Sequence, residues 1–482
     1  MGSQQTNKRI KTAGYRAILC KLITTNSYRN AADLFNETYH RKGTSSELSY
    51  GTLSGDVEQE GKQLLLVKRQ TTREILSRFG FDPDTGHYKG DVFPEEYCNT
   101  ECEMLTFDPD VFMEGVTPGW PEHSSEKPTG DEPEPEEDGE KQDRYSVPDL
   151  DEFHVEPKRR GKRIEVDPEK KESVCTGYAK WFNSQVTRQE YGIVHTHRIE
   201  KDSADVVYIS IDAVYVDKQS ATRKTANRDD TRCVIEKEKR IGHMNIKVEA
   251  EQGKYYITST DTDEAFRELI AVIMNNGLYR KYMIFMTDGE DAIHKKIEEY
   301  CGMWKHHFEL DWIHLDHKCY DRLSNALCGR KVCDPRGNTE YYKQGPKKGQ
   351  IRTQDRISQN CLFSRAVSRI LWAGNPQEAI AYLESINPKL IKDPVILQKL
   401  ILYIKRKQDW IPCYALRKKA GLKNSSNGVE GQNDMNVADR QKNNKTSWRP
   451  EGSSYLASIK TMLDNGESED WFVYGKISFT LR

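Results

Sequence analysis

Two apolar segments that each carry one acid at or near their end constrain the fold of this chain most strongly. Residues 205–216 (DVVYISIDAVYV) are rich in β-branched and aromatic side chains, which predicts a buried strand with Asp212 embedded in it. Residues 282–287 (YMIFMT) predict a second buried strand, which stops at Asp288. A buried carboxylate is unfavourable unless it is paired or binds a cation, so both acids require partners.

The segments around these two strands predict a mixed sheet with helices on its faces. Extended segments at residues 246–250 and 254–258 are separated by Glu-Gln-Gly, as in a hairpin, with residues 232–236 as an alternative first strand. A well-capped helix is expected at residues 262–278, and a short strand at residues 308–315. Strands that first form a meander and then alternate with helices indicate an α/β layer architecture.

Composition divides the chain into several parts, as expected for 482 residues, which exceed the size of one hydrophobic core. An amphipathic helix is predicted at residues 56–81 and another helix at 174–194, and residues 121–151 have the Pro, Glu and Gly content of a linker. The basic run at 158–163 (KRRGKR) is either a solvated hinge or a phosphate-contacting patch. We expect an N-terminal helical, possibly DNA-binding region at 1–119, a linker at 120–165, the first part of the core at 166–330, a helical insertion at 331–421, and the end of the core with a tail at 422–482.

Charge and cysteine usage exclude few classes of protein. The net charge is −2, so a nucleic-acid surface would need local segregation of charge. Because no run approaches about 18 apolar residues and the N-terminus lacks an apolar leader, we expect a protein without a membrane partner that stays in the cell. The eleven cysteines predict mostly reduced thiols, since neither local pair has a second pair at zinc-finger spacing. Those pairs are Cys98 with Cys102 and Cys328 with Cys333.

The chemistry of Asp212 and Asp288 suits a divalent cation. Ligand-binding groups gather at the carboxyl ends of strands in open α/β sheets, so the two acids could face one site. Hard oxygen ligands favour Mg²⁺ or Mn²⁺, and two such ions about 4 Å apart can promote phosphodiester chemistry. The structural alternatives are an acid on a strand edge and an acid that caps a helix. Other nearby acids that could be the ligands instead are Asp217, Glu290, Asp291 and, foremost, Asp311.

Three runs carry a resemblance to a known family. In order, they are TDGEDAIHKKIEEY, LDWIHLDHKCYDRL and RKKAGLKNSSNGVEGQNDMNVADRQKNNKTSWRPEGSSYLASI. With the strand order, they resemble the RNase H-like core of bacterial insertion-sequence DDE transposases, which are distantly related to eukaryotic Mutator elements. The likeness covers residues 174–463 and implies an RNase H-like mixed sheet with an all-helical insertion, whereas the N-terminal helical region is predicted from the helical pattern at 56–81 and lies outside the likeness.

The resemblance also implies the site residues and the partners. The third acid of the family pattern lies in Asn-Ser-Ser-Asn-x-x-Glu, which gives Asp212, Asp288 and Glu430 as catalytic residues and ligands of two Mg²⁺ or Mn²⁺ ions. The spacing of 142 residues between the last two acids leaves room for the insertion. The expected partner is double-stranded DNA, both element ends and target, bound by a homodimer or larger assembly in the cytoplasm of a bacterium, at the nucleoid.

Further DNA contacts are predicted around the third acid and after the strand candidate at 308–315. Residues 434–444 would form a helix that is either solvated or DNA-binding, with Arg440, Lys442 and Lys445 suited to phosphates. His314 is interpreted as a structural or DNA-contacting residue, because His314, His317 and Cys319 lack a fourth metal ligand. The tryptophans that could stack on unpaired bases or pack in a core are Trp312, Trp448 and Trp471.

The implied function is DNA strand cleavage and strand transfer by a transposase. One alternative is an RNase H-like nuclease or resolvase that cuts without joining. Another is a domesticated DNA-binding protein without catalysis. A glycosidase with paired carboxylates is a weaker alternative, since it needs only two acids.

Overall fold

The structure is a computed structural model that describes residues 12–99, 206–219, 240–329, 331–333, 339–354, 356–419, 423–425, 440–441 and 447–482. These residues belong to two compact units. Unit 1 contains the described residues before 104, from 206 to 308 and after 425, and unit 2 contains those from 309 to 425. The expected helix at 174–194, the alternative strand at 232–236 and the expected linker lie outside the described residues.

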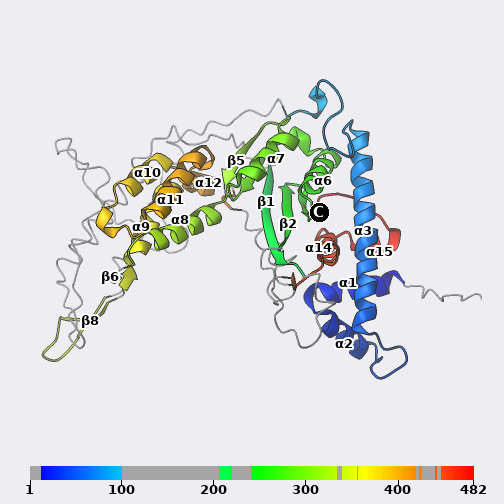
Figure 1. The fold of residues 1–482 in the computed structure, drawn as a ribbon, viewed down its shortest axis with the longest axis horizontal. Helices are drawn as coiled ribbons and strands as arrows, with labels where there is room; N and C mark the ends of the chain where they lie inside the picture. The colour runs from blue at the N-terminus through cyan, green and yellow to red at the C-terminus, as the bar shows by residue number, and fades with distance from the viewer. Residues whose placement is uncertain are drawn as a thin grey trace, which may run out of the picture. The chain divides into compact units, whose positions relative to one another are not determined.

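Unit 1 is built on a five-stranded sheet with the order β3-β2-β1-β4-β5 (Figure 1). Its strands are β1 (Val206–Asp217), β2 (Arg240–Ala250), β3 (Gly253–Ser259), β4 (Tyr282–Thr287) and β5 (His306–Leu310). β1 pairs antiparallel with β2 and parallel with β4, and β2 pairs antiparallel with β3. The sheet is therefore mixed, as the sequence predicts, and the strands expected at 205–216 and 282–287 are confirmed. The hairpin is also confirmed, although β2 begins earlier than expected.

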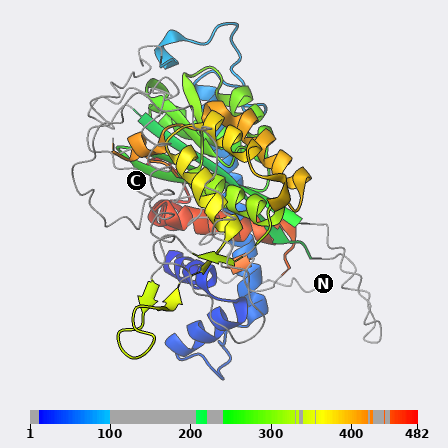
Figure 2. The same ribbon diagram turned by 90° about the vertical axis from the view of Figure 1, so that its left-hand side faces the viewer.

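Helices from both ends of the chain complete unit 1. They are α1 (Ala13–Thr25), α2 (Tyr28–Thr38), α3 (Tyr50–Arg78), α6 (Thr262–Asn275), α7 (Asp291–Cys301), α14 (Pro450–Asp464) and α15 (Ser468–Tyr474), with the short 3-10 helices η1 (Glu95–Tyr97) and η6 (Leu278–Arg280). Figures 1 and 2 show the blue N-terminal helices beside the red C-terminal ones, and α3 contacts both α6 and α14. The N-terminal helices thus share one hydrophobic core with the sheet.

The helix ends follow capping rules. Ser49 accepts a hydrogen bond from the backbone N–H of Thr52, so α3 begins at Tyr50, before the expected residue 56. Asp261 caps α6 in the same way, and the acids in its first turn suit the helix dipole. α6 is buried around most of its surface because it packs between the sheet and α3.

The outer edge of β3 is closed by the C-terminal part of the chain. The backbone N–H and C=O of Lys254 bond to Arg482, at 3.1 and 3.2 Å. The side chain of Asn465 bonds to both backbone groups of Tyr256, at 2.8 and 2.9 Å. These bonds satisfy an edge that would otherwise be free to pair with another strand.

Unit 2 is mostly helical and has its own core. Its helices are α8 (Trp312–Ala326), α9 (Gln359–Trp372), α10 (Pro376–Glu384), α11 (Pro394–Lys407) and α12 (Tyr414–Lys419), with the 3-10 helices η7 (Pro388–Leu390) and η8 (Gln408–Trp410). Two small sheets pair β6 (Lys331–Cys333) with β9 (Arg356–Ser358) and β7 (Thr339–Tyr341) with β8 (Ile351–Gln354). The expectation of an all-helical insertion at 331–421 is therefore wrong for its first part. Its short polar segments carry too few apolar residues at helical spacing to build a helix.

The strand expected at 308–315 is also shorter than predicted. β5 ends at Leu310, and α8 begins at Trp312. The cause is Asp311, whose side chain accepts a hydrogen bond from the backbone N–H of His314 and thereby caps α8. The apolar residues from Trp312 onward belong to a helix face that packs in the core of unit 2.

Candidate functional site

The pairing register of β1 and β4 aligns Asp212 with Asp288. The strands are parallel, and each pair, such as Val206 with Tyr282, is separated by 76 residues. The same spacing separates Asp212 from Asp288, which directly follows the last residue of β4, Thr287. Neighbouring strands lie about 4.8 Å apart. Asp212 and Asp288 are therefore expected at the same level on neighbouring segments of the sheet, at the carboxyl end of β4.

Asp212 lies on the face of the sheet that α14 covers. Its direct partner on β2 is Asn245, and directly paired residues of antiparallel strands share a face. Two residues earlier on that face, His243 Nε2 lies 2.7 Å from Ser453 Oγ of α14. Asp212 is half-buried, and its Oδ1 accepts a hydrogen bond of 2.8 Å from the backbone N–H of Ala213. The carboxylate is thus half-buried and oriented by the backbone next to it.

Asp288 is held in a tight turn between β4 and α7. Gly289 has a φ of +84°, a left-handed conformation that favours glycine. Asp288 Oδ1 accepts a hydrogen bond of 2.9 Å from the backbone N–H of Glu290, and Thr287 Oγ1 accepts one of 3.2 Å from Gly289. Thr287 Oγ1 also lies 2.7 Å from Nε2 of His294, a buried residue of α7. These bonds restrict the orientation of the Asp288 carboxylate before any ligand binds.

A row of neutral polar side chains, which was not predicted from the sequence, continues across the same face. Thr258 on β3 donates a hydrogen bond of 2.7 Å to Oδ1 of Asn245, and Thr461 Oγ1 of α14 lies 3.1 Å from Thr258 Oγ1. All three residues are at most 2% exposed. Burial lowers the pKa of nearby His243 to about 4, so that its ring is neutral at physiological pH.

The third predicted acid, Glu430, lies outside the described residues, as do Lys442 and Lys445. Gln441, which is described, lies eleven residues after Glu430 and contacts α14. There Gln441 Nε2 donates a hydrogen bond of 3.2 Å to the carbonyl of Ser453 in α14.

Arg440 has a packing role instead of the predicted phosphate contact. It is 6% exposed, and its Nε donates a hydrogen bond of 3.2 Å to the carbonyl of Ile23. Its guanidinium lies 5.5 Å from the ring centre of Tyr28 and 5.1 Å from that of Trp448. Burial lowers its pKa. A guanidinium enclosed by two rings and bonded to a carbonyl cannot also bind a DNA phosphate without leaving the core.

Asp311 and His314 belong to unit 2, where they form the N-terminal cap of α8. Asp311 is 1% exposed, and besides the backbone of His314 it lies 3.2 Å from Nδ1 of the His314 ring. Helix capping therefore explains why an acid occupies position 311, the residue considered foremost as an alternative metal ligand. The His314 side chain is 29% exposed, and its predicted DNA contact stays a prediction.

The described part of the chain contains no group of three or more His, Cys, Asp or Glu side chains arranged to hold a metal ion, and Glu430 is not in that part. The tryptophans considered for base stacking are buried instead, in agreement with the alternative of core packing: Trp312, Trp448 and Trp471. Each cysteine whose side chain is described is a free thiol. No described helix has the length and apolar character needed to cross a membrane.

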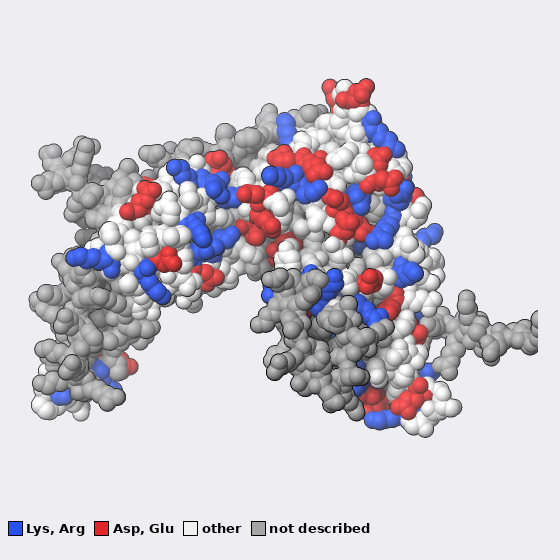
Figure 3. Space-filling view, in the orientation of Figure 1, with Lys and Arg blue, Asp and Glu red and all other residues white. Residues whose placement is uncertain are grey.

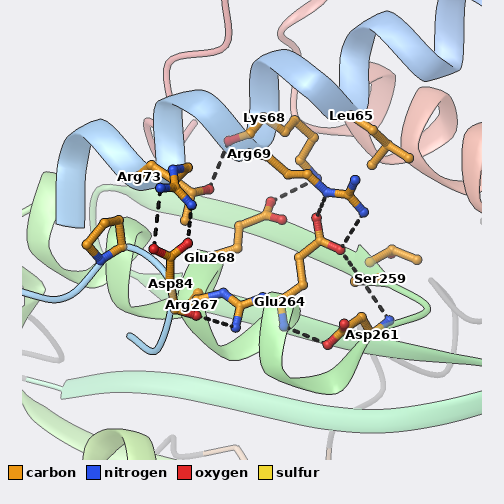
Figure 4. Close-up of a pocket in the computed structure, with 13 residues that line it drawn as sticks. Leu65, Lys68, Arg69, Arg73, Asp84, Ser259, Asp261, Glu264, Arg267 and Glu268 are labelled. Carbon is orange, nitrogen blue, oxygen red and sulfur yellow. Dashed lines mark hydrogen bonds and ion pairs between the residues drawn. The ribbon is translucent and has the colours of Figure 1, made fainter. Parts of the chain in front are cut away.

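A polar pocket of about 290 Å³ lies away from these acids, between α3 and α6 (Figure 4). Arg69 bonds both carboxylate oxygens of Glu264, at 2.5 and 3.1 Å, and the Lys68 ammonium lies 2.8 Å from buried Glu268. Burial raises the pKa of Glu268 to about 7, against the opposing effect of Lys68. These cations already pair with acids of the facing helix, so the ion pairs hold α3 and α6 together. The pocket is therefore a poor anion site.

Positive charge is concentrated in one segment. Residues 309–425 carry 22 Lys and Arg against 11 Asp and Glu, a net charge of +11, whereas the whole chain has −2. The N-terminal helical region, residues 12–99, carries 11 against 12, a net charge of −1. Figure 3 shows lysine and arginine side chains spread over the helices of unit 2, with fewer acidic ones. The total charge of the chain therefore conceals an excess of positive charge in residues 309–425.

No family model matches this chain, and neither a curated protein nor a solved structure matches it. The functional assignment therefore depends on the geometry and electrostatics described above.

Proposed function

We propose that this chain is an RNase H-like DDE transposase, which cuts DNA strands at the ends of a mobile element and joins them to target DNA. The observation that carries the proposal is the parallel register of β1 and β4, which, continued two residues beyond its last pair, Ser210 with Met286, brings Asp212 level with Asp288. Two carboxylates placed side by side repel each other, and a divalent cation between them removes that repulsion.

The donor set fits Mg²⁺ or Mn²⁺. Asp212 and Asp288 would hold one ion, and Asp212 with Glu430 would hold a second. Bound there, the ions activate the attacking oxygen and stabilise the leaving oxygen of a phosphodiester. The backbone N–H groups of Ala213 and Glu290 already restrict the two described carboxylates, which reduces the conformational entropy lost when a cation binds.

The position of Gln441 supports Glu430 as the third acid. Gln441 bonds to Ser453, and Ser453 bonds to His243, which lies on the same face of the sheet as Asp212. Eleven residues of chain span at most about 38 Å, enough to connect this anchor with any point on the face.

The charge of unit 2 supports DNA as the substrate. Lysine and arginine side chains in excess bind the phosphate backbone with little regard to sequence, and release of counterions drives that binding. Helix α11 contains no acidic residue and carries three exposed cations, Lys399, Lys405 and Arg406. We expect unit 2 to contribute most of the sequence-independent affinity, and the active assembly to be a homodimer or larger.

The test uses a donor plasmid that carries the gene with its natural flanking DNA. Asp288→Asn is expected to lower strand cleavage by about a thousandfold or more, because several kcal/mol of transition-state stabilisation are lost. DNA affinity should change less than about twofold, since phosphate contacts lie elsewhere. The matched control is Glu290→Gln, which removes an exposed acid two residues away and should leave cleavage near the wild-type rate.

The products separate the alternatives. Joining of a cut 3′ end to target DNA is expected. Metal-dependent cutting without joining would favour a nuclease or resolvase, and absence of cutting by the wild-type chain would favour a DNA-binding protein without catalysis. Wild-type cleavage by Asp288→Asn would reject the proposed site.

A further inference from the structure

A hairpin of unit 2, formed by β7 and β8 and called here the basic hairpin (residues 339–354), carries a dense group of positive charges. Its one acid is Glu340, and its four exposed cations are Lys343, Lys347, Lys348 and Arg352. None of these four cations forms an ion pair with another described residue. Their charge is therefore not neutralised within the described part of the chain.

The basic hairpin contributes little to the folding of unit 2. None of its described residues belongs to either hydrophobic core, and Figure 1 shows β8 beyond the helices of unit 2. Tyr341 is 41% exposed, although a tyrosine ring usually packs against other residues. A segment that leaves an aromatic ring and four cations in solvent is typical of a binding surface.

The tip of the basic hairpin has a defined shape. Gly349 donates from its backbone N–H to the carbonyl of Tyr342 at 2.9 Å, which closes the loop, and Lys348 donates to the carbonyl of Gly345 at 3.0 Å, which forms a turn. Both glycines have a left-handed φ, +83° at 345 and +85° at 349, although a Cβ at either would meet no described atom within 4 Å. The backbone conformation therefore requires them, and the turn holds Lys347 and Lys348 at the end of a two-stranded ribbon.

We propose that the basic hairpin enters the major groove of duplex DNA and places Lys347 and Lys348 against its phosphates. The inference rests on the proposed function, because it takes DNA as the substrate. The major groove of B-form DNA, about 12 Å wide, admits a two-stranded ribbon, whereas the major groove of an RNA duplex is too narrow. Three lysines among the four cations favour DNA over a protein partner, since lysine binds phosphate as a point charge and is depleted in protein interfaces.

Binding of short duplexes to the full chain tests the inference without reference to catalysis. Fluorescence anisotropy measures the affinity for labelled DNA between about 50 and 300 mM salt. The double variant Lys347→Gln/Lys348→Gln is expected to bind about 5- to 50-fold more weakly at about 100 mM salt. The slope of log Kd against log salt should fall by about 1.8, because each lost phosphate contact removes about 0.9.

Two further measurements test entry into the groove. Gly349→Val retains every cation but strains the tip, so it should weaken DNA binding by a smaller factor than the double variant. On an RNA duplex of the same sequence, the wild type and the double variant should differ by less than about twofold, because the hairpin does not fit that groove.

Lys21→Gln/Lys62→Gln is the matched control. It removes the same charge from exposed lysines of α1 and α3 and should keep the wild-type affinity and salt slope. Thermal unfolding by circular dichroism establishes that each variant is folded. Wild-type affinity and slope in Lys347→Gln/Lys348→Gln would overturn the inference and leave the proposed function standing. Equal losses on DNA and RNA, or wild-type DNA affinity in Gly349→Val, would overturn entry into the groove. If the wild-type chain binds no DNA, the proposed function itself fails.

Discussion

At the scale of single residues, unit 1 keeps two kinds of carboxylate apart. Asp212 and Asp288 are half-buried, and each accepts a hydrogen bond from a backbone N–H group nearby. Glu268 is buried in the core and is paired with Lys68. We propose that the first kind of carboxylate receives a cation from solution, whereas the second belongs to an ion pair between helices.

The buried Glu268 predicts a specific dependence of stability on pH. Its pKa is raised by burial from 4.5 to about 7, with Lys68, Glu264 and Glu467 as the charged neighbours. Because the folded state holds this proton more tightly than the unfolded state, the group favours folding below about pH 4.5, and this contribution is lost as pH rises toward 7. The loss amounts to up to roughly 3 kcal/mol.

Urea denaturation between pH 4.5 and 8 measures this effect. Glu268→Gln removes the titration, so its free energy of unfolding should fall less steeply than that of the wild type between pH 4.5 and 7. The control Glu58→Gln alters an exposed acid of α3 and should keep the wild-type slope. Parallel curves for Glu268→Gln and the wild type would contradict the assignment.

At the scale of elements, α3 joins the N-terminal and C-terminal parts of unit 1 through a close approach to α14. A Cβ added at Gly61 would lie 2.9 Å from Cα of Tyr455 and nearer still to its Cβ. In the same helix, a Cβ at Gly55 would meet no described atom within 4 Å. The two glycines therefore have different physical roles.

Alanine at the two positions should shift stability in opposite directions. Gly55→Ala is expected to stabilise unit 1 by about 0.5–1 kcal/mol, because alanine loses less entropy in a helix. Gly61→Ala gains the same propensity but forces α3 away from α14, and overpacking of this kind costs about 1–3 kcal/mol. Thermal unfolding of both variants checks this, and an equal rise in the unfolding temperature for both would show that the helices do not approach so closely.

Elements with a clear local signal could be predicted from the sequence. β4 and the start of α6 agree with expectation because an apolar run and an aspartate cap define them. The segment after Leu310 was assigned to the preceding strand and lies in a helix, since its apolar residues fit both a strand and a helix face until the cap at Asp311 is known. Burial of Arg440 was equally hidden, because Ile23 and Tyr28, which it contacts, belong to a segment far away in the chain.

The matching levels of Asp212 and Asp288 could be predicted for one physical reason. Six residues of strand precede Asp212 in β1 and six precede Asp288 in β4, so two strands that start level bring their acids level. Asn245 was missed because its place depends on a two-residue turn at 251–252, which sets the register of β2 against β3. The hairpin predicted from the sequence did not specify that register.

At the scale of the whole molecule, the excess positive charge and the acids proposed for catalysis lie in different units. The net charge of −2 conceals a segment of +11 at residues 309–425, while the acids proposed for catalysis belong to unit 1. We therefore expect DNA contacts in residues 309–425 and not in the N-terminal helices, whose net charge is −1. Binding and catalysis should therefore be separable by mutation.

We propose that acids remote in the chain hold divalent cations together. Anomalous scattering from crystals of the full chain with Mn²⁺ locates these cations. We expect a Mn²⁺ peak with carboxylate oxygens of both Asp212 and Asp288 as ligands, at about 2.1 Å as for a hard cation, and with Glu430 nearby. Crystals with Mn²⁺ bound only elsewhere, and with the carboxylates of Asp212 and Asp288 turned away from each other, would contradict it.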